Sequence, residues 1–222
     1  MGASRMGKIK KPTIAIFLNH PECSAHCCVG MYEALHPHYK VTFFNRDQIK
    51  SKLFKNLDII AFPGGIGDSD TFDKLIKPNI DYVKEYVVNG GRYLGVCMGA
   101  YWAGHHYFDI LDGVRAEQYI KRPNADVRRS FGTVSNVTWK NQQENMYFYD
   151  GCSLIGDESK FDTVARYPNG DPMAIMQNRI GVIGCHPEAL PSWYDKQHLK
   201  PHWHNYQHHK LLLDFTNELL AR

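Results

Sequence analysis

A single cysteine stands between two glycines in the spacing Gly95-x-Cys97-x-Gly99, and an apolar run leads into it. This pattern predicts a strand that turns sharply into a helix, with the cysteine at the turn. The tight turn requires small neighbours and pushes the side chain at its apex into the open. Amides at the start of the helix face the same space, where they stabilise a thiolate or a developing oxyanion. The spacing therefore favours Cys97 as a nucleophile, and a buried filler cysteine is the competing interpretation.

A thiol nucleophile needs a base, and the base needs a group that orients it. His186 is distinguished among twelve histidines because it directly follows the apolar run 179–185 and stands two residues before Glu188. If the strands at 92–96 and 179–185 are parallel neighbours, their carboxyl ends bring His186 within reach of Cys97. Glu188 would then fix the imidazole tautomer and stabilise the imidazolium. A plain polar turn is the competing interpretation of the same residues.

A glycine-rich segment that includes Gly64 and Gly65 follows another apolar run. Glycine lets the backbone approach a ligand closely, so the Gly65 amide could complete an oxyanion hole together with the Met98 amide. A simple strand-to-helix turn, capped by Ser69 or Asp68, explains the same segment without a ligand. The three elements together are more specific than any one of them.

Alternating strands and helices are expected to position these residues. Short apolar runs predict strands at 13–18, 39–44, 57–62 and 92–96. Helices are predicted between them at 24–35, near 46–53, and at 69–89 with a break at Pro78. This alternation indicates βαβ units, and hence an α/β, flavodoxin-like, doubly wound and mostly parallel sheet.

The pattern changes between about 108 and 178, where an antiparallel β elaboration is predicted. Its expected strands, separated by Gly, Asn and Asp turns, lie at 130–139, 145–151, 162–167 and 172–177. A buried strand at 179–185 and an amphipathic helix at about 204–220 follow. We expect a flexible N-terminal tail over 1–12 and a single domain over 13–222.

The composition excludes several classes of partner. A net charge of +3 without a concentrated basic stripe argues against nucleic acid and acidic membrane surfaces. No apolar run approaches the roughly 20 residues that span a bilayer. Six cysteines without a secretion signal favour reduced thiols, and hence a cytoplasmic location.

Three stretches, in chain order, resemble the class I glutamine amidotransferase-like superfamily: AFPGG at 61–65, YLGVCMGAYWAG at 93–104 and GVIGCHPEA at 181–189. The chain most resembles the branch found as the N-terminal domain of some eukaryotic biotin–protein ligases and as free-standing proteins. The similarity spans roughly residues 13 to 190. It implies a flavodoxin-like fold, a Cys97–His186–Glu188 triad, and an oxyanion hole formed by Gly65 and Met98.

One position departs from the superfamily. Glutamine-hydrolysing members usually have Gln two residues after the second glycine, where this chain has Tyr101. We therefore expect a pocket that differs from a conventional glutamine pocket, with Gly64 and Tyr101 contacting the substrate. The chain has the length of an amidotransferase domain alone, so any ammonia would be used by a separate synthetase or acceptor protein.

The leading interpretation is an enzyme that acts on an amide-type C–N bond of a small molecule through a thioester on Cys97. The alternative is a non-catalytic small-molecule sensor or regulatory docking domain. A third interpretation is a glyoxalase-like or other thiol hydrolase activity, which usually calls for a histidine directly after the cysteine, where Met98 stands. No cofactor and no metal are expected.

Other segments have competing interpretations. Cys23, His26, Cys27 and Cys28 are dense enough for zinc, but a second paired element is missing, so a loop lining the cleft is favoured. The His-rich stretch 198–209 is expected to be a packed surface segment rather than a metal site. The aromatic residues that could either wall a pocket or fill the core are Tyr101, Trp102, Tyr119 and Tyr147.

Overall fold

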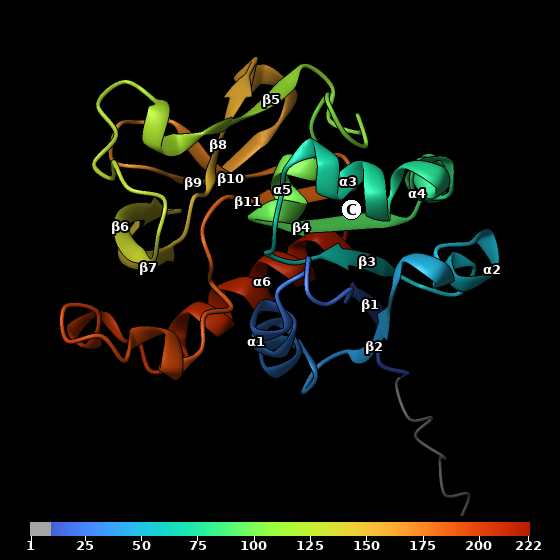
Figure 1. Cartoon of the computed structure of the whole chain (residues 1–222), viewed down its shortest axis with the longest axis horizontal. Coiled ribbons are helices and arrows are strands. Elements are labelled where there is room, and N and C mark those ends of the chain that lie inside the picture. Colours follow the sequence, from blue (N-terminus) through green and yellow to red (C-terminus); the bar gives the residue numbers. More distant parts are fainter. Residues whose placement is uncertain (1–9) are drawn as a thin grey trace, which may run out of the picture.

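The computed structural model describes residues 10–222, and a nine-stranded mixed sheet runs through it in the order β2-β1-β3-β4-β11-β10-β9-β6-β7 (Figure 1). The first five strands in this order run parallel to one another. Their bounds are β2 Lys40–Phe44, β1 Thr13–Phe17, β3 Ile59–Phe62, β4 Arg92–Val96 and β11 Ile180–Ile183. The predicted parallel sheet is thereby confirmed.

The remaining strands form the predicted antiparallel elaboration. β10 Pro172–Gln177 pairs antiparallel with β11, and β9, β6 and β7 continue the sheet. A separate two-stranded ribbon joins β5 to β8. The bounds of these other strands are β5 Val114–Gln118, β6 Thr133–Trp139, β7 Gln142–Phe148, β8 Cys152–Gly156 and β9 Asp162–Arg166.

Helices cover both faces of the parallel strands, as in a doubly wound, flavodoxin-like fold. In Figure 1, α1 and α6 lie on one side of these strands, and α3, α4 and α5 lie on the other. The α-helices are α1 Ala25–Leu35, α2 Ser51–Phe54, α3 Ser69–Leu75, α4 Ile80–Val88, α5 Met98–Trp102 and α6 Gln207–Leu220. The 3-10 helices are η1 Arg46–Gln48, η2 Lys77–Asn79, η3 Tyr119–Lys121, η4 Glu158–Lys160, η5 Pro191–Tyr194 and η6 Lys200–His202.

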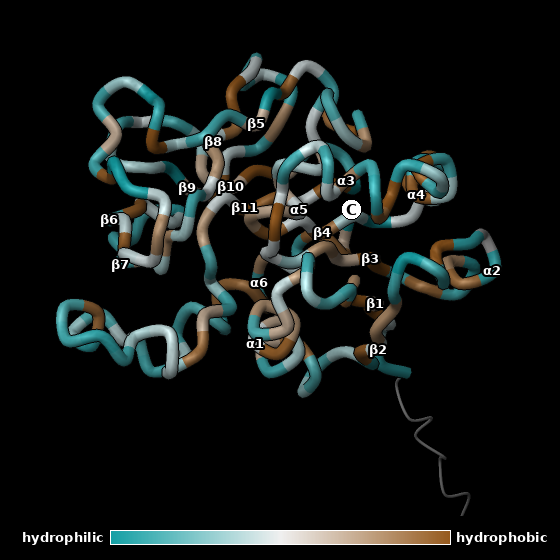
Figure 2. The backbone as a smooth tube through the Cα atoms, viewed as in Figure 1, coloured by the Kyte–Doolittle hydropathy of each residue, from teal (hydrophilic) through white to brown (hydrophobic). Residues whose placement is uncertain are grey.

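The hydrophobic core lies along the parallel strands, where Figure 2 shows the tube mostly brown. Every residue of β3 and β11 is buried, which is typical of strands covered on both faces. An aromatic cluster fills the layer between β3, β4 and α5, with Phe62 stacked on Tyr93 and in contact with Trp102 and Phe108. This rigid layer supports the end of β4, where Cys97 follows.

Two predicted elements differ from the structure for local reasons. The helix expected at 69–89 is divided at η2, because Pro78 lacks the amide that a continuous helix needs there. The strand expected at 145–151 is β7, which starts three residues earlier, since a tight turn at Lys140 pairs Gln142 with Trp139. β5 and β8 were not predicted from the sequence.

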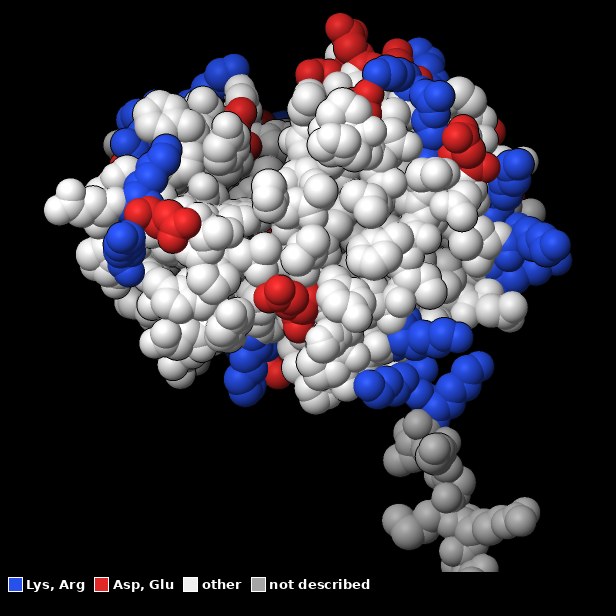
Figure 3. Space-filling view, turned by 60° about the horizontal axis from the view of Figure 1, so that its bottom comes forward, with Lys and Arg blue, Asp and Glu red and all other residues white. Residues whose placement is uncertain are grey.

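The predicted tail at 1–12 lies mostly outside the described residues. Of the part that is described, Lys11 donates a hydrogen bond to the Pro37 carbonyl at 2.8 Å, and Pro12 accepts one from the Lys40 amide. On the face drawn in Figure 3, Lys and Arg side chains gather toward the margins and the middle is mainly uncharged. Within residues 10–222, no helix has both the length and the apolar character needed to cross a bilayer.

Candidate active site

Cys97 occupies the sharp turn between β4 and α5 that its glycine spacing predicts. Its backbone has φ 50° and ψ −102°, in a region that residues other than glycine rarely adopt. The turn is held by the Cys97 amide, which donates to the Ile183 carbonyl at 2.8 Å, and by the Tyr101 amide, which donates to the Cys97 carbonyl at 3.1 Å. Strained conformations of this kind persist where surrounding contacts fix them, as at active sites.

Gly99 is required by close packing rather than by its backbone angles. A Cβ atom at this position would collide with the carbonyl oxygen of Phe62 at the end of β3. The Gly99 amide donates to the Pro63 carbonyl at 3.2 Å, so α5 is pressed directly onto the neighbouring strand end. This contact explains why the residue after the turn must be small.

Gly99→Ala is therefore expected to lower the free energy of unfolding by about 1–3 kcal/mol, because a methyl group must displace backbone. Urea denaturation monitored by tryptophan fluorescence measures the effect. Gly67→Ala is the matched control, since its Cβ would lie 3.6–3.8 Å from Met98, an ordinary van der Waals distance. Equal stability of the two variants would show that the packing of Gly99 does not constrain the turn.

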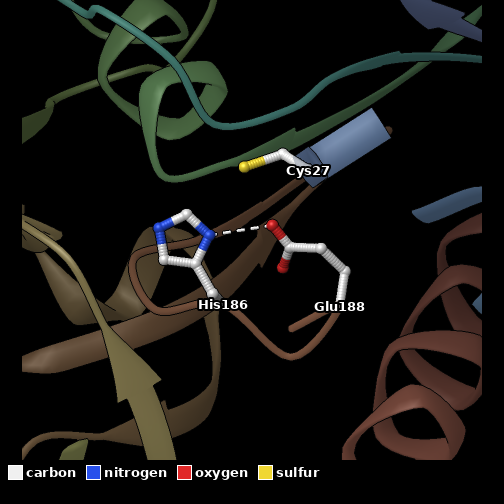
Figure 4. A group of neighbouring side chains, drawn as sticks. All are labelled: Cys27, His186 and Glu188. Atoms are coloured by element: carbon white, nitrogen blue, oxygen red, sulfur yellow. Dashed lines mark hydrogen bonds and ion pairs between the residues drawn. The ribbon is translucent and has the colours of Figure 1, made fainter. Parts of the chain in front are cut away.

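His186 and Glu188 meet directly after β11. β11 pairs parallel with β4 in the register Ile183 to Val96, so the pairing assumed from the sequence is confirmed. The Nδ1 atom of His186 lies 2.8 Å from Oε1 of Glu188, and both side chains are buried, with 4% and 0% of their areas exposed. Figure 4 shows this contact and the second ring nitrogen, Nε2, facing away from Glu188.

The electrostatic surroundings of His186 favour its protonated form. Burial alone would lower the pKa of His186, but the Glu188 carboxylate and the nearby sulfurs of Cys97 and Cys27 together raise it well above its usual value. An imidazolium beside a cysteine sulfur stabilises a thiolate. The arrangement thus places a cationic imidazolium near a cysteine sulfur.

The Cys97 thiol donates to the Tyr149 carbonyl, with the sulfur 3.5 Å from the oxygen. Among the described residues, Nε2 of His186 has no hydrogen-bond partner. The sulfur and the imidazole are nevertheless close enough for the sulfur to raise the pKa of His186. Loose pairing of nucleophile and base is common before a substrate binds.

A cavity of about 1150 Å³ opens above the turn. It brings together five of the predicted site residues, which are Cys97, His186, Gly65, Met98 and Tyr101. Cys97 retains 7% exposure on this cavity, so its sulfur is not sealed in the core. Glu188 lies behind His186, in the position expected of an orienting group.

Gly65 and Met98 lie next to each other at the cavity wall. A Cβ at Gly65 would stand 2.8 Å from the Met98 sulfur. Within residues 10–222, neither backbone amide donates a hydrogen bond to a protein acceptor. Amides without a protein acceptor are one requirement of an oxyanion hole.

Gly64 and Tyr101 differ in their relation to the cavity. Gly64 does not line it; a Cβ there would stand 2.6 Å from the Cys27 sulfur and 2.8 Å from Cε1 of His186. Gly64 thus makes room for the imidazole ring. Tyr101 lines the cavity, and its hydroxyl donates to the Asp150 carbonyl at 3.1 Å.

The segment 20–28 lines the same cavity through Cys23, His26 and Cys27, as the loop interpretation predicts. Cys28 does not line the cavity, and its sulfur lies 3.7 Å from the sulfur of Cys23. Of the four aromatic residues with two interpretations, Tyr101 and Tyr147 line the cavity, whereas Trp102 and Tyr119 are fully buried in the core.

Cys27 is the residue nearest to the imidazole that the triad prediction does not include. Figure 4 shows its side chain projecting from α1 toward the ring of His186. One possible ligand atom from each of Cys27, His186 and Glu188 lies within 4.8 Å of the others, and side chains of these three types can hold a metal ion. The hydrogen bond between His186 and Glu188 already uses two of them, and burial raises the pKa of the Cys27 thiol to about 11.

Two contacts support the backbone of Glu188 from outside the cavity. His209 of α6 lies with Nε2 3.1 Å from the carbonyl oxygens of both Glu188 and Ala189. Gly30 of α1 packs directly on the Glu188 carbonyl, with no space for a Cβ.

In the rest of the His-rich segment, His204 stacks on His208 with ring centroids 3.7 Å apart, as expected of a packed segment.

This fold is shared with solved glutamine amidotransferase structures. A glutamine amidotransferase from Thermotoga maritima matches with a TM-score of 0.68 at 8% identity, covering 96% of this chain and 100% of that chain. PurLQS from Thermotoga maritima matches with a TM-score of 0.64 at 13% identity, covering 94% and 99%. The chain therefore has the class I glutamine amidotransferase-like fold.

At the level of sequence, residues 19–113 match the model of the family described as biotin-protein ligase, N terminal. The chain thus combines the amidotransferase-like fold with a relationship to that N-terminal domain. No curated protein sequence matches it. A β-galactosidase from Marinomonas ef1 also shares the fold, with a TM-score of 0.55 at 12% identity over 95% of this chain and 29% of that chain. Chemistry must therefore be argued from the site rather than from the fold.

Proposed function

We propose that this protein is a cysteine-dependent enzyme that cleaves or transfers the acyl group of an amide-type C–N bond in a small molecule. The observation that carries the proposal is the convergence of Cys97, on a strained turn, with the buried His186–Glu188 pair at one cavity. The amidotransferase-like fold supports the same class of reaction.

In the proposed reaction, Cys97 reacts as a thiolate whose proton is held on Nε2 of His186, and its sulfur attacks the carbonyl carbon and forms a C–S bond. The negative charge that develops on the carbonyl oxygen is stabilised by the amides of Gly65 and Met98. His186 gives its Nε2 proton to the departing nitrogen, so that the C–N bond breaks and an amine or ammonia leaves. Water or an acceptor amine then attacks the thioester, and His186 takes up the proton of that nucleophile. The C–S bond breaks, which releases the acid or the new amide and returns Cys97 to the thiolate beside the imidazolium.

Glu188 has two tasks in this scheme. Glu188 holds the His186 ring through Nδ1, which leaves Nε2 directed to the reacting groups. Glu188 also keeps the imidazolium stable inside the protein, where burial alone would disfavour a charge. Neither task requires Glu188 to touch the substrate.

A sensor without catalysis is the second candidate function, and one contact favours it. The Cys97 thiol donates to the Tyr149 carbonyl rather than pairing with His186, which is a resting arrangement suited to binding alone. Aromatic side chains on the cavity wall would serve a binding site equally well.

Intact-mass spectrometry after brief incubation with a mixture of small amides distinguishes the two functions. An enzyme of the proposed type is expected to gain the mass of an acyl group, and peptide mapping is expected to place that group on Cys97. A protein that binds amides, measured by thermal shift, but never carries an acyl group would be a sensor. Cys97→Ala, which keeps the cavity but removes the sulfur, is the matched control.

A further inference from the structure

Acidic side chains line the cavity, and its basic side chains among the described residues are the histidines His20, His26 and His186, of which His186 is paired with Glu188. Glu22, Asp68 and Asp150 contribute to its wall, and none of the lining residues within the described chain is Lys or Arg. Glu22 is neutralised from outside by Lys74. No cation among residues 10–222 pairs with Asp68 or Asp150, which accept only from the Thr71 amide and the Gln118 side-chain amide. Within the described chain, the carboxylates of Asp68 and Asp150 are therefore not paired with a Lys or Arg side chain.

Asp150 stands next to the nucleophile. It directly follows Tyr149, whose carbonyl accepts the Cys97 thiol, and its own carbonyl accepts the Tyr101 hydroxyl. Both carboxylate oxygens lie 3.1 Å from Nε2 of Gln118, so the carboxylate is held in place. Its backbone has φ 47°, a conformation that Asp and Asn tolerate better than most residues.

Two further observations point to a ligand at this place. Nε2 of His186, on a side chain more than nine-tenths buried, faces the cavity without a hydrogen-bond partner among the described residues. Aromatic rings complete the wall, and the faces of such rings attract cations. The aromatic lining residues are Tyr101, Tyr107, Tyr147, Tyr149 and Trp193.

We infer that the substrate carries a protonated amine near the amide that Cys97 attacks, and that the Asp150 carboxylate binds this amine. The inference rests on the proposed function. A substrate carboxylate placed at Asp150 would meet a like charge there, without a Lys or Arg of the described chain to pair with. Asp150 is thus the residue that selects the charge of the substrate.

Three matched chloroacetamides test this inference: N-(2-aminoethyl), N-propyl and N-(2-carboxyethyl) chloroacetamide. In each, the Cys97 thiolate forms an S–C bond and chloride leaves, and the rate is read by intact mass with peptide mapping. The cationic probe is expected to label Cys97 at least about tenfold faster than the anionic probe at low ionic strength. Added salt is expected to reduce this preference.

Asp150→Asn is expected to reduce the cationic preference to less than about threefold while the neutral probe keeps its rate within about twofold. Asn tolerates the backbone conformation of this position and keeps an acceptor for Gln118. Asp214→Asn is the matched control, because Asp214 is an acidic residue on α6, paired with Lys210, that does not line the cavity. The control is expected to keep the full preference.

The outcomes separate the inference from the proposed function. If Cys97 is labelled faster than the other cysteines but at equal rates by all three probes, the substrate class is wrong and the nucleophile stands. If Asp68→Asn rather than Asp150→Asn removes the preference, the assignment to Asp150 is wrong. If no probe labels Cys97 faster than the other five cysteines, the proposed function itself fails.

Discussion

Cys97→Ser is expected to lower the rate of amide cleavage by at least about a thousandfold. The serine hydroxyl would stand on the same turn, but the imidazolium of His186, which stabilises a thiolate, does not deprotonate an alcohol. The release of amine or ammonia from a panel of small amides measures this loss. Labelling by iodoacetamide gives a second measurement, since the most reactive cysteine is expected to disappear.

Cys27→Ala is the informative comparison, because Cys27 is the second sulfur beside His186. Burial raises the pKa of Cys27 to about 11, so its thiol stays protonated at neutral pH. We expect this variant to change the rate by less than about tenfold. A large loss in Cys27→Ala with activity retained in Cys97→Ser would exchange the roles of the two cysteines.

Glu188→Gln is expected to lower the rate of amide cleavage by about 10³–10⁴-fold, as seen when the orienting carboxylate of a triad becomes an amide. The variant also removes the charge that keeps the pKa of His186 above its usual value. The titration of His186, followed by NMR, is expected to move to lower pH. Alkylation of Cys97 at neutral pH is expected to slow once the pKa of His186 falls below 7, because the imidazolium that favours the thiolate is then lost.

The same substitution has a defined effect on stability. A histidine whose pKa is raised on folding stabilises the protein fully below its unfolded pKa, about 6.5, and loses this contribution as the pH rises through the folded pKa. The difference in free energy of unfolding between wild type and Glu188→Gln is therefore expected to be largest near pH 6. It is expected to shrink as the pH rises, and a difference that grows with pH would contradict the assignment.

Glu144→Gln is the matched control for this prediction. Glu144 also pairs with a buried histidine, His208, at 3.0 Å, but neither residue lines the cavity. Its loss is expected to affect stability without changing the alkylation rate of Cys97. A similar slowing in both variants would indicate a general loss of structure rather than a role for Glu188.

The sequence predicted those parts of the fold and site that depend on local pattern. Buried parallel strands are continuous apolar runs, so β1, β3, β4 and β11 were found within a few residues. The strand ends carry Cys97 and His186, and the parallel pairing of β4 with β11 brings them to one edge. Two short motifs separated by almost ninety residues were therefore enough to place the centre of the site.

The missing parts depend on long-range contacts. β5 carries charged residues and is a strand only because it pairs with β8, about forty residues later. Gln118 and Asp150 meet at one end of that pairing, where β5 ends and β8 is about to begin, and neither has a neighbouring pattern that indicates a binding role. Cys27 stands out in the sequence as part of a cysteine-rich segment, but its approach to His186 depends on how α1 packs.

Because Gly30 packs on the Glu188 carbonyl, helix α1 lies directly against the backbone of the residue whose carboxylate orients His186. The segment just before this helix lines the cavity, so a single helix joins the cavity wall to the residue that orients the imidazole.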